Sequence, residues 1–361
     1  PPHPAPLLPP KRRRSPRLTF PKLGYTRRMS NILQSDIWAR FQESNGHTVI
    51  RKSGNGWSYL ATVEGGATGR YLYSPYGPVA SSAVAFDEAL ASLKEEAAKH
   101  RCLFVRIEPT ESAIWGDQDA AAFLARRGAV LAPRQVQPSH TQIIDLSGSE
   151  DEILKGMKSN NRNLHRNIHK KGVTIEVSTN PEDLSILFAF LDETADRNGF
   201  NRQQDDYLMQ VARVLMPAGA ASLYIAKLTD ENGESTPIAA AFVYDSDDTR
   251  TYAHAAASFE HRRLSAGIPV VTNFILDAKR KGLKYVDLFG IAPEDQPDHE
   301  WAGFTKFKKS FGGESVEYPG TWDVPVSSLG YRAYTLAYKA RPAVRDAVSK
   351  AKAKVQSFRS R

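Results

Sequence analysis

Three strand-like runs in succession, followed by a helix and one more strand, constrain the fold of this chain most strongly. Polar turns containing Asn, Asp and Gly separate these runs. A helical pattern over Ile268–Lys281 follows, and then a strand over Tyr285–Phe289. Strands that alternate with helices predict an α/β (α+β) fold in which helices flank mixed sheets. The three runs are Ala221–Leu228, Ser235–Tyr244 and Thr249–Ala257.

A similar succession of short strands and helices occupies residues 30–140. It includes a turn at Ser74-Pro-Tyr-Gly-Pro78 and a helical pattern over Ala83–Lys99. The chain has 361 residues, enough for two domains with cores of their own. The order of meander, helix, strand and helix resembles the acyltransferase half of a GNAT-type domain, and we expect two such domains in tandem.

The segment Trp301–Gly313 combines aromatic and basic residues. Phe304, Phe307 and Phe311 recur at i, i+3 and i+7, which predicts a short helix with the three rings on one packing face. The glycine pair that ends the segment predicts the C-terminal cap of this helix. On pattern alone this is an amphipathic helix with solvated lysines, which are Lys306, Lys308 and Lys309.

The net charge of +8 is unevenly distributed. Residues 1–28 contain eight Lys or Arg and no acid, and the last 31 residues contain nine Lys or Arg and one acid. The intervening residues 29–330 have 31 basic and 39 acidic side chains, a net charge of −8. A polyanionic partner would therefore have to bind local basic patches. We interpret residues 1–28 as a disordered basic extension, and Met29 is a candidate native start.

Four cations recur at i+4 in the predicted helix Glu150–Lys171, away from its apolar stripe. Like charges at this spacing repel, so the stripe is slightly unfavourable unless an anion bridges it. It is either a solvated helix face or a groove for the phosphates of a nucleotide or an RNA backbone. The four are Lys158, Arg162, Arg166 and Lys170.

Two further places carry candidate polar contacts. Where the helix before residue 200 ends, Arg197 or Arg202 either clamps a phosphate or caps the helix. The strand Thr249–Ala257 alternates Tyr252 and His254 on one face. Such a face suits a polar acyl substrate, and a tyrosine satisfied within the core is the alternative.

Several classes of protein lack their signatures here. The sequence has no P-loop, no G-x-S-x-G elbow, no H-E-x-x-H motif and no dinucleotide fingerprint, and we expect no metal site. Its one cysteine, Cys102, excludes an internal disulfide and predicts a buried thiol in a reducing compartment. The loop His261–Gly267, where a GNAT acyl-CoA loop would lie, lacks repeated glycines. The sequence contains no run of 18 apolar residues, so it predicts no membrane-spanning helix.

An ordered series of motifs over about residues 30–335 resembles the Fem family (FemA, FemB and FemX) of peptidoglycan-bridge aminoacyltransferases. Each motif alone is weak, whereas their order is specific. The absence of a heptad insertion after residue 145 makes the chain similar to the compact FemX-like form, without a coiled-coil arm. The main motifs are Ile32-Leu-Gln-Ser-Asp-Ile-Trp-Ala39, Pro75-Tyr-Gly-Pro-Val79, Phe104-Val-Arg-Ile-Glu-Pro109, Val286-Asp-Leu-Phe-Gly290 and Gly303-Phe-Thr-Lys-Phe-Lys-Lys-Ser-Phe-Gly-Gly313.

The resemblance implies a division of the chain. Residues 29–145 together with 318–361 would form the first GNAT-like domain, which binds the precursor and carries a basic C-terminal helix. Residues 146–317 would form the second, on the side of the tRNA and the catalytic lysine. The family can show an acid shortly after the Tyr-Gly-Pro turn, whereas this chain has Ser81, which argues against an essential base there.

The resemblance also implies roles for individual residues. Phe307 and Lys308 match the family's catalytic Phe-Lys pair, Lys308 stabilising charge near the tRNA 3′ end and Phe307 stacking on the terminal adenosine. The basic residues implied to contact tRNA or other phosphates are Lys158, Arg162, Arg166, Lys170, Lys306 and Lys309. The residues implied to bind the acceptor are Trp38, Arg40, Tyr76, Arg197, Arg202, Tyr207 and Tyr252.

The implied reaction transfers an amino acid from aminoacyl-tRNA to the side-chain amine of a peptidoglycan-precursor stem peptide, which is UDP-linked or lipid-linked. It needs no cofactor, since aminoacyl-tRNA is itself the donor. We expect a cytoplasmic protein with peripheral contact to the inner membrane face. The alternatives are a GNAT-type N-acyltransferase that uses acyl-CoA and a non-catalytic RNA- or membrane-surface-binding protein. Binding of acetyl-CoA would favour the acyl-CoA-dependent acyltransferase. Loss of function on removal of residues 1–28 would favour the non-catalytic binding protein.

Overall fold

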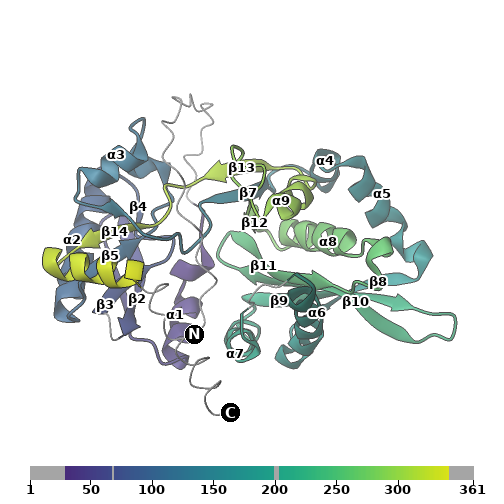
Figure 1. Cartoon of the computed structure of the whole chain (residues 1–361). Helices are drawn as coiled ribbons and strands as arrows, with labels where there is room; N and C mark the ends of the chain where they lie inside the picture. Colours follow the sequence, from purple (N-terminus) through teal and green to yellow (C-terminus); the bar gives the residue numbers. More distant parts are fainter. Residues whose placement is uncertain (1–28, 67–68, 199–202, 341–361) are drawn as a thin grey trace, which may run out of the picture. The chain divides into compact units, whose positions relative to one another are not determined.

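The computed structural model describes residues 29–66, 69–198 and 203–340, and these residues form two compact units. Unit 1 contains residues 29–46, 109–112 and 134–320, and unit 2 contains residues 47–108, 113–133 and 321–340. Each is built on a mixed seven-stranded sheet (Figure 1). The predicted α/β class with two GNAT-like units is confirmed. Residues 1–28 and Arg202 lie outside the described residues.

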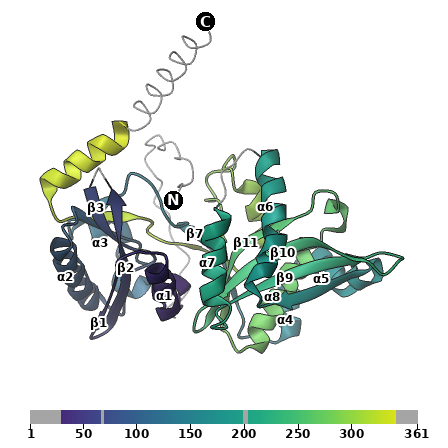
Figure 2. The same ribbon diagram turned by 90° about the horizontal axis from the view of Figure 1, so that it is seen from below.

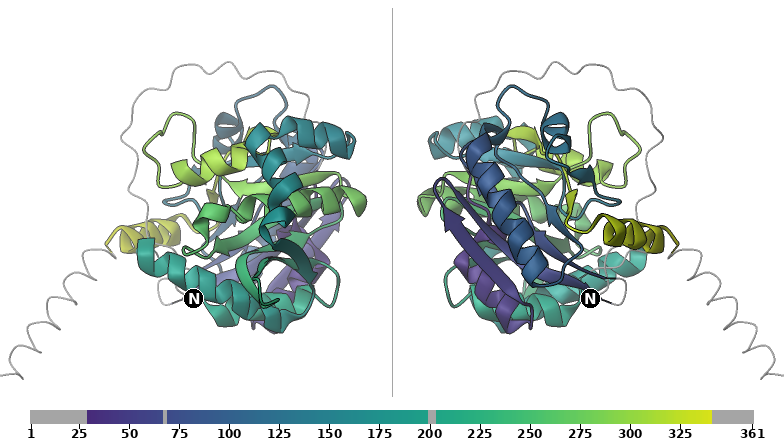
Figure 3. Two further views of the ribbon diagram at one scale, coloured as in Figure 1. Left: turned by 90° about the vertical axis from the view of Figure 1, so that its right-hand side faces the viewer. Right: turned by 90° about the vertical axis from the view of Figure 1, so that its left-hand side faces the viewer.

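The sheet of unit 2 has the strand order β1-β2-β3-β5-β14-β6, with β4 paired to β2. The C-terminal part of the chain contributes β14, which lies between β5 and β6. Helices α2 (Ala83–Lys99) and α3 (Ala120–Ala125) pack on one face, and α2 crosses in front of the strands in the right panel of Figure 3. The strands are β1 (Val49–Gly54), β2 (Trp57–Gly66), β3 (Gly69–Ser74), β4 (Val79–Ala80), β5 (Phe104–Ile107), β6 (Val130–Leu131) and β14 (Trp322–Pro325).

A helical segment that begins at residue 328 covers the other face of this sheet, shown in yellow in Figure 2. Tyr334 packs on Tyr71 and Phe104, while Leu72 and Val105 turn toward α2, as alternation along a strand requires. Beneath the segment, buried Arg106 donates to both carboxylate oxygens of Asp323, at 2.7 and 2.9 Å.

The sheet of unit 1 has the strand order β13-β7-β12-β11-β10-β9-β8. The predicted meander forms β9 (Ala221–Thr229), β10 (Ser235–Asp245) and β11 (Thr249–Ala257), all antiparallel neighbours. The strand β12 (Tyr285–Gly290) then pairs in parallel with β11. The remaining strands are β7 (His140–Asp145), β8 (Val173–Ser178) and β13 (Glu314–Glu317).

Helices cover both faces of this second sheet, as the left panel of Figure 3 shows from the side of α5 and β8. The main apolar core lies between the sheet and α8, and α4, α5 and Phe311 complete it. On the opposite face α6 contacts β10 and β11, and α1 contacts α7. The helices are α1 (Asp36–Ser44), α4 (Glu150–Gly156), α5 (Ser159–Asn167), α6 (Leu184–Asn198), α7 (Asp205–Leu215), α8 (Gly267–Arg280) and α9 (Ala302–Lys309).

The structure divides the chain differently from the predicted boundaries at two places. Helix α1 packs against α7, and β7 lies between β12 and β13, so both belong to unit 1. The predicted first domain included both elements. The alternating residue pattern of β7 is a local property of the sequence. The sheet that β7 joins depends instead on pairing with residues more than 100 positions away.

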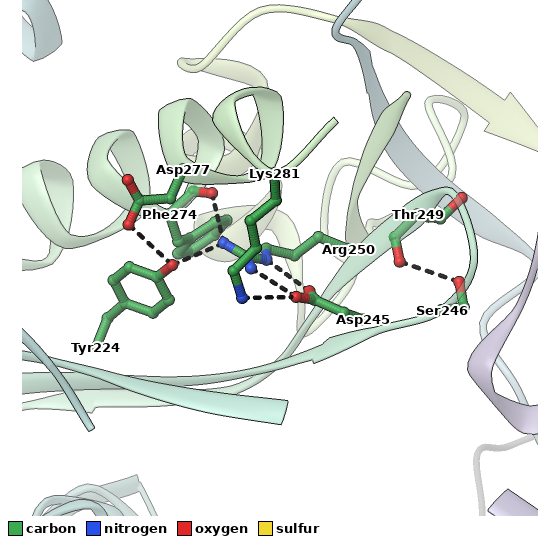
Figure 4. A network of polar contacts seen from close by, with 8 residues as sticks. All are labelled: Tyr224, Asp245, Ser246, Thr249, Arg250, Phe274, Asp277 and Lys281. Carbon is green, nitrogen blue, oxygen red and sulfur yellow. Dashed lines mark hydrogen bonds and ion pairs between the residues drawn. The ribbon is translucent and has the colours of Figure 1, made fainter. Parts of the chain in front are cut away.

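A buried polar network ties the meander to α8 in unit 1 (Figure 4). Arg250 is fully buried on β11 and donates to Asp245 through two bonds of 2.6 Å. Its remaining nitrogen donates to the Tyr224 hydroxyl at 2.7 Å and the Phe274 carbonyl at 3.0 Å. Tyr224 in turn donates to Asp277 at 3.1 Å. The guanidinium is thus satisfied from β9, β10 and α8, which fixes the helix on the sheet.

Candidate active site

The strands β11 and β12 separate at the centre of unit 1. They pair in parallel only from Thr249 to Thr251, against Tyr285 to Asp287. Beyond this point Phe289 adopts φ 63°, a left-handed conformation that bulky side chains rarely take. Its N–H donates to the Asp287 carboxylate at 2.7 Å, which holds the backbone in this conformation. The end of β12 therefore turns away from β11.

Lys308 reaches both strands at this separation. Its ammonium nitrogen Nζ donates to the Gly290 carbonyl at 2.7 Å and lies 6.0 Å from the centre of the Tyr252 ring. One strand supplies a fixed acceptor and the other an aromatic face, so the lysine is directed into the space between them. Gly290 is required here, because a Cβ would lie 2.9 Å from Trp301 and 3.0 Å from Pro138.

Helix α9 positions Lys308. The Thr305 hydroxyl accepts from the Ala292 N–H at 2.8 Å and donates to the Trp301 carbonyl at 2.9 Å, which ties the helix start to the loop after β12. Phe311 is buried in the core, and Phe307 packs edge-on against it at 5.1 Å.

The glycine pair predicted to end this helix follows it, with φ 84° at Gly312 and 75° at Gly313. A Cβ at Gly312 would lie 2.8 Å from the Gly156 carbonyl oxygen, and one at Gly313 would lie 2.1 Å from that of Ile143. The glycines therefore allow the end of α9 to approach the backbone of α4 and β7.

Burial changes the acidity of the groups around this lysine. Desolvation lowers the pKa of Lys308 to about 8, although the negative charge of Asp287 raises it in part. The buried Asp287 carboxyl accepts hydrogen bonds from Thr141 and the Phe289 N–H, yet burial raises its pKa. A lysine with a pKa this close to neutrality can serve both as a charged hydrogen-bond donor and as a proton donor.

The prediction that Phe304, Phe307 and Phe311 share one packing face is wrong at Phe304. The Phe304 side chain is 56% exposed, whereas Phe307 is half-buried against the core. Residues i and i+4 of a helix share a face, so Phe304 lies beside Lys308 rather than beside Phe311. Lys306 is exposed, and Lys309 forms an ion pair with Glu294 at 2.8 Å.

The predicted cation stripe does not exist as one helix face. The chain leaves the helix at Met157 and Lys158, both with extended ψ angles, so α4 and α5 are separate helices. Arg162 turns back and donates to the carbonyls of Lys155, at 3.2 Å, and Met157, capping the end of α4. Lys158, Arg166 and Lys170 are exposed. Asn161, which belongs to none of the predicted sites, is buried and donates to Ser310 beyond α9.

Tyr252 and His254 were predicted to share a face of β11, and this is wrong. A bulge at Ala253 shifts the register between β11 and β10. Tyr252 therefore packs on Phe274 under α8, whereas His254 packs on Tyr244 on the opposite face. Only Tyr252 belongs to the site of Lys308.

The remaining predicted acceptor contacts do not gather at Lys308. Trp38 is buried between Phe41 and Tyr244, and Tyr207 packs edge-on against Phe41, so both stabilise the packing of α1 and α7. Arg40 is exposed on α1.

Two other predicted contacts lie elsewhere. Tyr76 belongs to unit 2, where its ring is buried and its backbone N–H donates to Glu108 at 3.4 Å. Arg197 is exposed, and its guanidinium carbon lies 4.7 Å from the centre of the Phe259 ring.

The structure adds three residues to the site that the pattern analysis did not assign: Thr141, Asp287 and Gly290. The sequence signal for Asp287 and Gly290 is a carboxylate in an otherwise apolar strand that ends in glycine, Val286-Asp-Leu-Phe-Gly290. Burying a carboxylate is unfavourable without partners, and such positions are often functional.

Two mixed α/β units, one of which holds a partly buried lysine where two strands separate, define a tandem GNAT-like fold. The model of the FemAB family matches residues 127–229 and 220–339, which together exceed half of the chain. The chain belongs to the FemAB family, and by this membership it is an aminoacyltransferase.

The chain is similar to individual proteins in sequence or in fold. The chain is 21% identical to the aminoacyltransferase FemA of Staphylococcus aureus (strain MRSA252) over 75% of this chain and 83% of FemA. The crystal structure of FemX is similar with a TM-score of 0.74 and 19% identity, covering 84% of this chain and 94% of FemX. A C-terminal domain of a putative lysylphosphatidylglycerol synthetase from Agrobacterium fabrum has a TM-score of 0.53 at 13% identity, covering 86% and 95%.

Proposed function

We propose that this protein transfers an amino acid from aminoacyl-tRNA to the side-chain amine of a peptidoglycan-precursor stem peptide. The observation that carries the proposal is Lys308, held by Gly290 and Tyr252 where two parallel strands separate. Membership of the FemAB family supports the donor and the acceptor class. The ester of the donor is already activated, so the proposed reaction needs no further cofactor.

The proposed reaction requires the protein mainly to position two substrates and to stabilise developing charge. The acceptor nitrogen attacks the ester carbonyl carbon, a C–N bond forms, and the bond to the ribose oxygen breaks. The nitrogen loses a proton and the ribose oxygen gains one. In our proposal the Lys308 ammonium donates to the developing oxyanion or to the departing ribose oxygen. The carbonyl of Gly290 then serves to orient this ammonium before substrates bind.

An in vitro transfer assay tests the proposed function directly. Purified full-length protein is incubated with a panel of charged tRNAs and with UDP-linked and lipid-linked precursors, and the stem peptide is analysed by mass spectrometry. We expect one aminoacyl group to be added with at least one donor and acceptor pair. Acetylation from acetyl-CoA without any aminoacyl transfer would instead show the acyl-CoA enzyme.

The dependence of activity on pH tests the charge of Lys308. Its pKa is about 8, so the ammonium is protonated below this pH and neutral above it. Because Lys308→Arg stays charged, the ratio of wild-type to variant activity should fall as the pH rises through about 8. The ratio cancels the ionisation of the acceptor amine, which is common to both proteins. A constant ratio from about pH 6.5 to 9.5 would contradict a charged donor with a pKa of about 8.

We further propose that the protein works in the cytoplasm and that the helical segment 328–340 contacts an anionic membrane surface, where a lipid-linked acceptor would lie. Tyr331 and Tyr334 anchor one side of the segment on unit 2. Its other side exposes Leu329 (80%) and Leu336 (69%), seven residues apart and so on one face. Exposed Arg332 and Lys339 flank these leucines. Exposed leucines beside cations are typical of interfacial helices, and no helix among the described residues is long and apolar enough to cross a membrane.

Vesicle co-sedimentation tests this contact. The double variant Leu329→Gln/Leu336→Gln should lose most of its binding to vesicles rich in phosphatidylglycerol, because the apolar area that inserts is removed. Val84→Gln is the matched control, since Val84 is 69% exposed on α2. Equal binding by all three proteins, or equal binding to phosphatidylcholine vesicles, would contradict an anionic membrane surface as the partner.

A further inference from the structure

We infer that Asp287 is a positioning residue for the proposed reaction: its carboxylate fixes the end of β12 so that the Gly290 carbonyl holds the Lys308 ammonium. The inference rests on the proposed function, because it concerns the same lysine. Asp287 is buried on β12 and lies three residues before Gly290. It acts on Lys308 through the backbone of its own strand and through its charge, and it contacts neither substrate.

The strand β12 contains one extra residue between Asp287 and Gly290. Asp287 lies opposite Ile143 on β7 and Gly290 lies opposite Thr141, so three steps along β12 match two steps along β7. Such a bulge bends the strand and turns its groups in a new direction, and bulges are common next to active sites. The bulge of β12 ends at the carbonyl that accepts the hydrogen bond from Lys308.

The Asp287 carboxylate holds this bulge in place. Its oxygen Oδ1 accepts hydrogen bonds from the Thr141 hydroxyl and, at 2.7 Å, from the Phe289 N–H. Thr141 is completely buried on β7. One oxygen atom thus joins the bulged backbone to the neighbouring strand, and it stabilises the left-handed φ of 63° at Phe289, which a bulky residue disfavours. Without this acceptor we expect Phe289 to relax and the Gly290 carbonyl to turn away from Lys308.

The charge of the carboxylate acts on the same ammonium. Among the residues that the structure describes, Asp287 is the charged group that raises the pKa of Lys308, against the effect of burial. Both hydrogen bonds to Asp287 come from donors, which favours the ionised carboxylate although burial opposes it. From β11 the ammonium faces Tyr252, whose pKa is raised by burial, so that its hydroxyl stays uncharged. Lys308 therefore keeps its proton to a higher pH than it would without Asp287.

Kinetics test the position of the ammonium. Asp287→Ala removes the acceptor for the Phe289 N–H, and kcat for aminoacyl transfer should fall by about 10²-fold, the loss expected when a catalytic group is misplaced by about 1 Å. KM for both substrates should not change, because Asp287 contacts neither. An unchanged kcat in folded Asp287→Ala would overturn the inference.

Variants of Thr141 test the same contact without removing the carboxylate. Thr141→Val removes the hydroxyl and should lower kcat, and Thr141→Ser, which keeps the hydroxyl, should restore it. Thr62→Val is the matched control, since Thr62 is a buried threonine of unit 2 that donates to Glu64 at 2.8 Å. Equal kcat values for Thr141→Val and Thr62→Val would contradict a role of the carboxylate in holding Lys308.

A titration of Lys308 without substrates tests the charge and separates it from folding. In full-length protein with isotope-labelled lysine, NMR follows the Cε resonance of Lys308, which is assigned by its absence in Lys308→Arg. The wild-type midpoint should lie at about pH 8. Asp287→Asn keeps an acceptor oxygen but removes the charge, so its midpoint should be lower. Asp277→Asn is the matched control, since Asp277 also accepts from a hydroxyl in unit 1, that of Tyr224 at 3.1 Å, and its midpoint should equal that of the wild type.

The outcomes distinguish this inference from the proposed function. Equal midpoints in the wild type and Asp287→Asn would refute the role of Asp287, whether or not the protein transfers an aminoacyl group. Absence of transfer by the wild type would refute the proposed function and would leave the titration result unchanged. A residue that only stabilised the fold would lower Tm when replaced, but it would not shift the midpoint of Lys308.

Discussion

Lys308→Met should reduce aminoacyl transfer by about 10²- to 10³-fold or more, since removing one donor to a developing oxyanion has this effect. Methionine keeps the length and apolar stem of lysine but has no ammonium to donate to the substrate. Initial rates with saturating aminoacyl-tRNA and precursor measure the loss. Lys155→Met, which removes an exposed lysine on α4, should leave the rate unchanged.

The stability of the same variant separates catalysis from folding. Burial lowers the pKa of Lys308, which means that its charge is unfavourable in the folded protein. Replacing it with methionine should therefore leave Tm unchanged or raise it, and circular dichroism should be unaffected. Full activity in Lys308→Met would refute the assigned role, and a lower Tm would indicate that the lysine stabilises α9 instead.

Arg250→Met should destabilise unit 1 by about 3–5 kcal/mol, because it leaves a buried carboxylate without its main partner. Arg250 is completely buried and donates to Asp245 at 2.6 Å through both arms of the guanidinium. Lys281 remains, at 3.3 Å from Asp245, but contributes one exposed ammonium. Urea unfolding monitored by circular dichroism measures the change.

Two matched variants sharpen this test. Arg213→Met removes an exposed ion pair with Glu182 at 3.1 Å and should change stability by less than about 1 kcal/mol. The double variant Arg250→Met/Asp245→Leu removes both buried charges and should recover part of the lost stability. Equal effects of Arg250→Met and Arg213→Met would show that the buried network (Figure 4) does not hold the meander on α8.

Local patterns predicted most secondary-structure elements because their causes are local. The meander, α8 and α9 followed from apolar periodicity and from turn residues, and the glycine pair after α9 adopts the positive φ angles expected of a helix end. Cys102 is buried, as its apolar neighbours predicted. The ordered motifs also predicted the family, since each depends only on which residues occur in which order.

The predictions that are wrong concern features that depend on contacts between residues distant in the sequence. The helix predicted over residues 150–171 breaks at Met157 because the Lys158 N–H donates to Ser310 at 2.9 Å, a residue beyond α9. The register shift at Ala253 depends on β10 and separates Tyr252 from His254. The aromatic packing of Trp38 against Tyr244 likewise depends on a distant residue, and the acceptor contact implied for Trp38 stays a prediction.

The amino-acid sequence by itself determined the α/β class and the family, because these depend on local periodicity and on the order of short motifs, and the same motifs predict Lys308 as the catalytic residue. Tertiary structure alone decided the surroundings of that lysine. The separation of β11 from β12 brings Gly290 and Tyr252, 38 positions apart in the sequence, to the same ammonium. The pKa of Lys308 and the exposure of Phe304 follow from burial, which depends on contacts between distant elements rather than on local pattern.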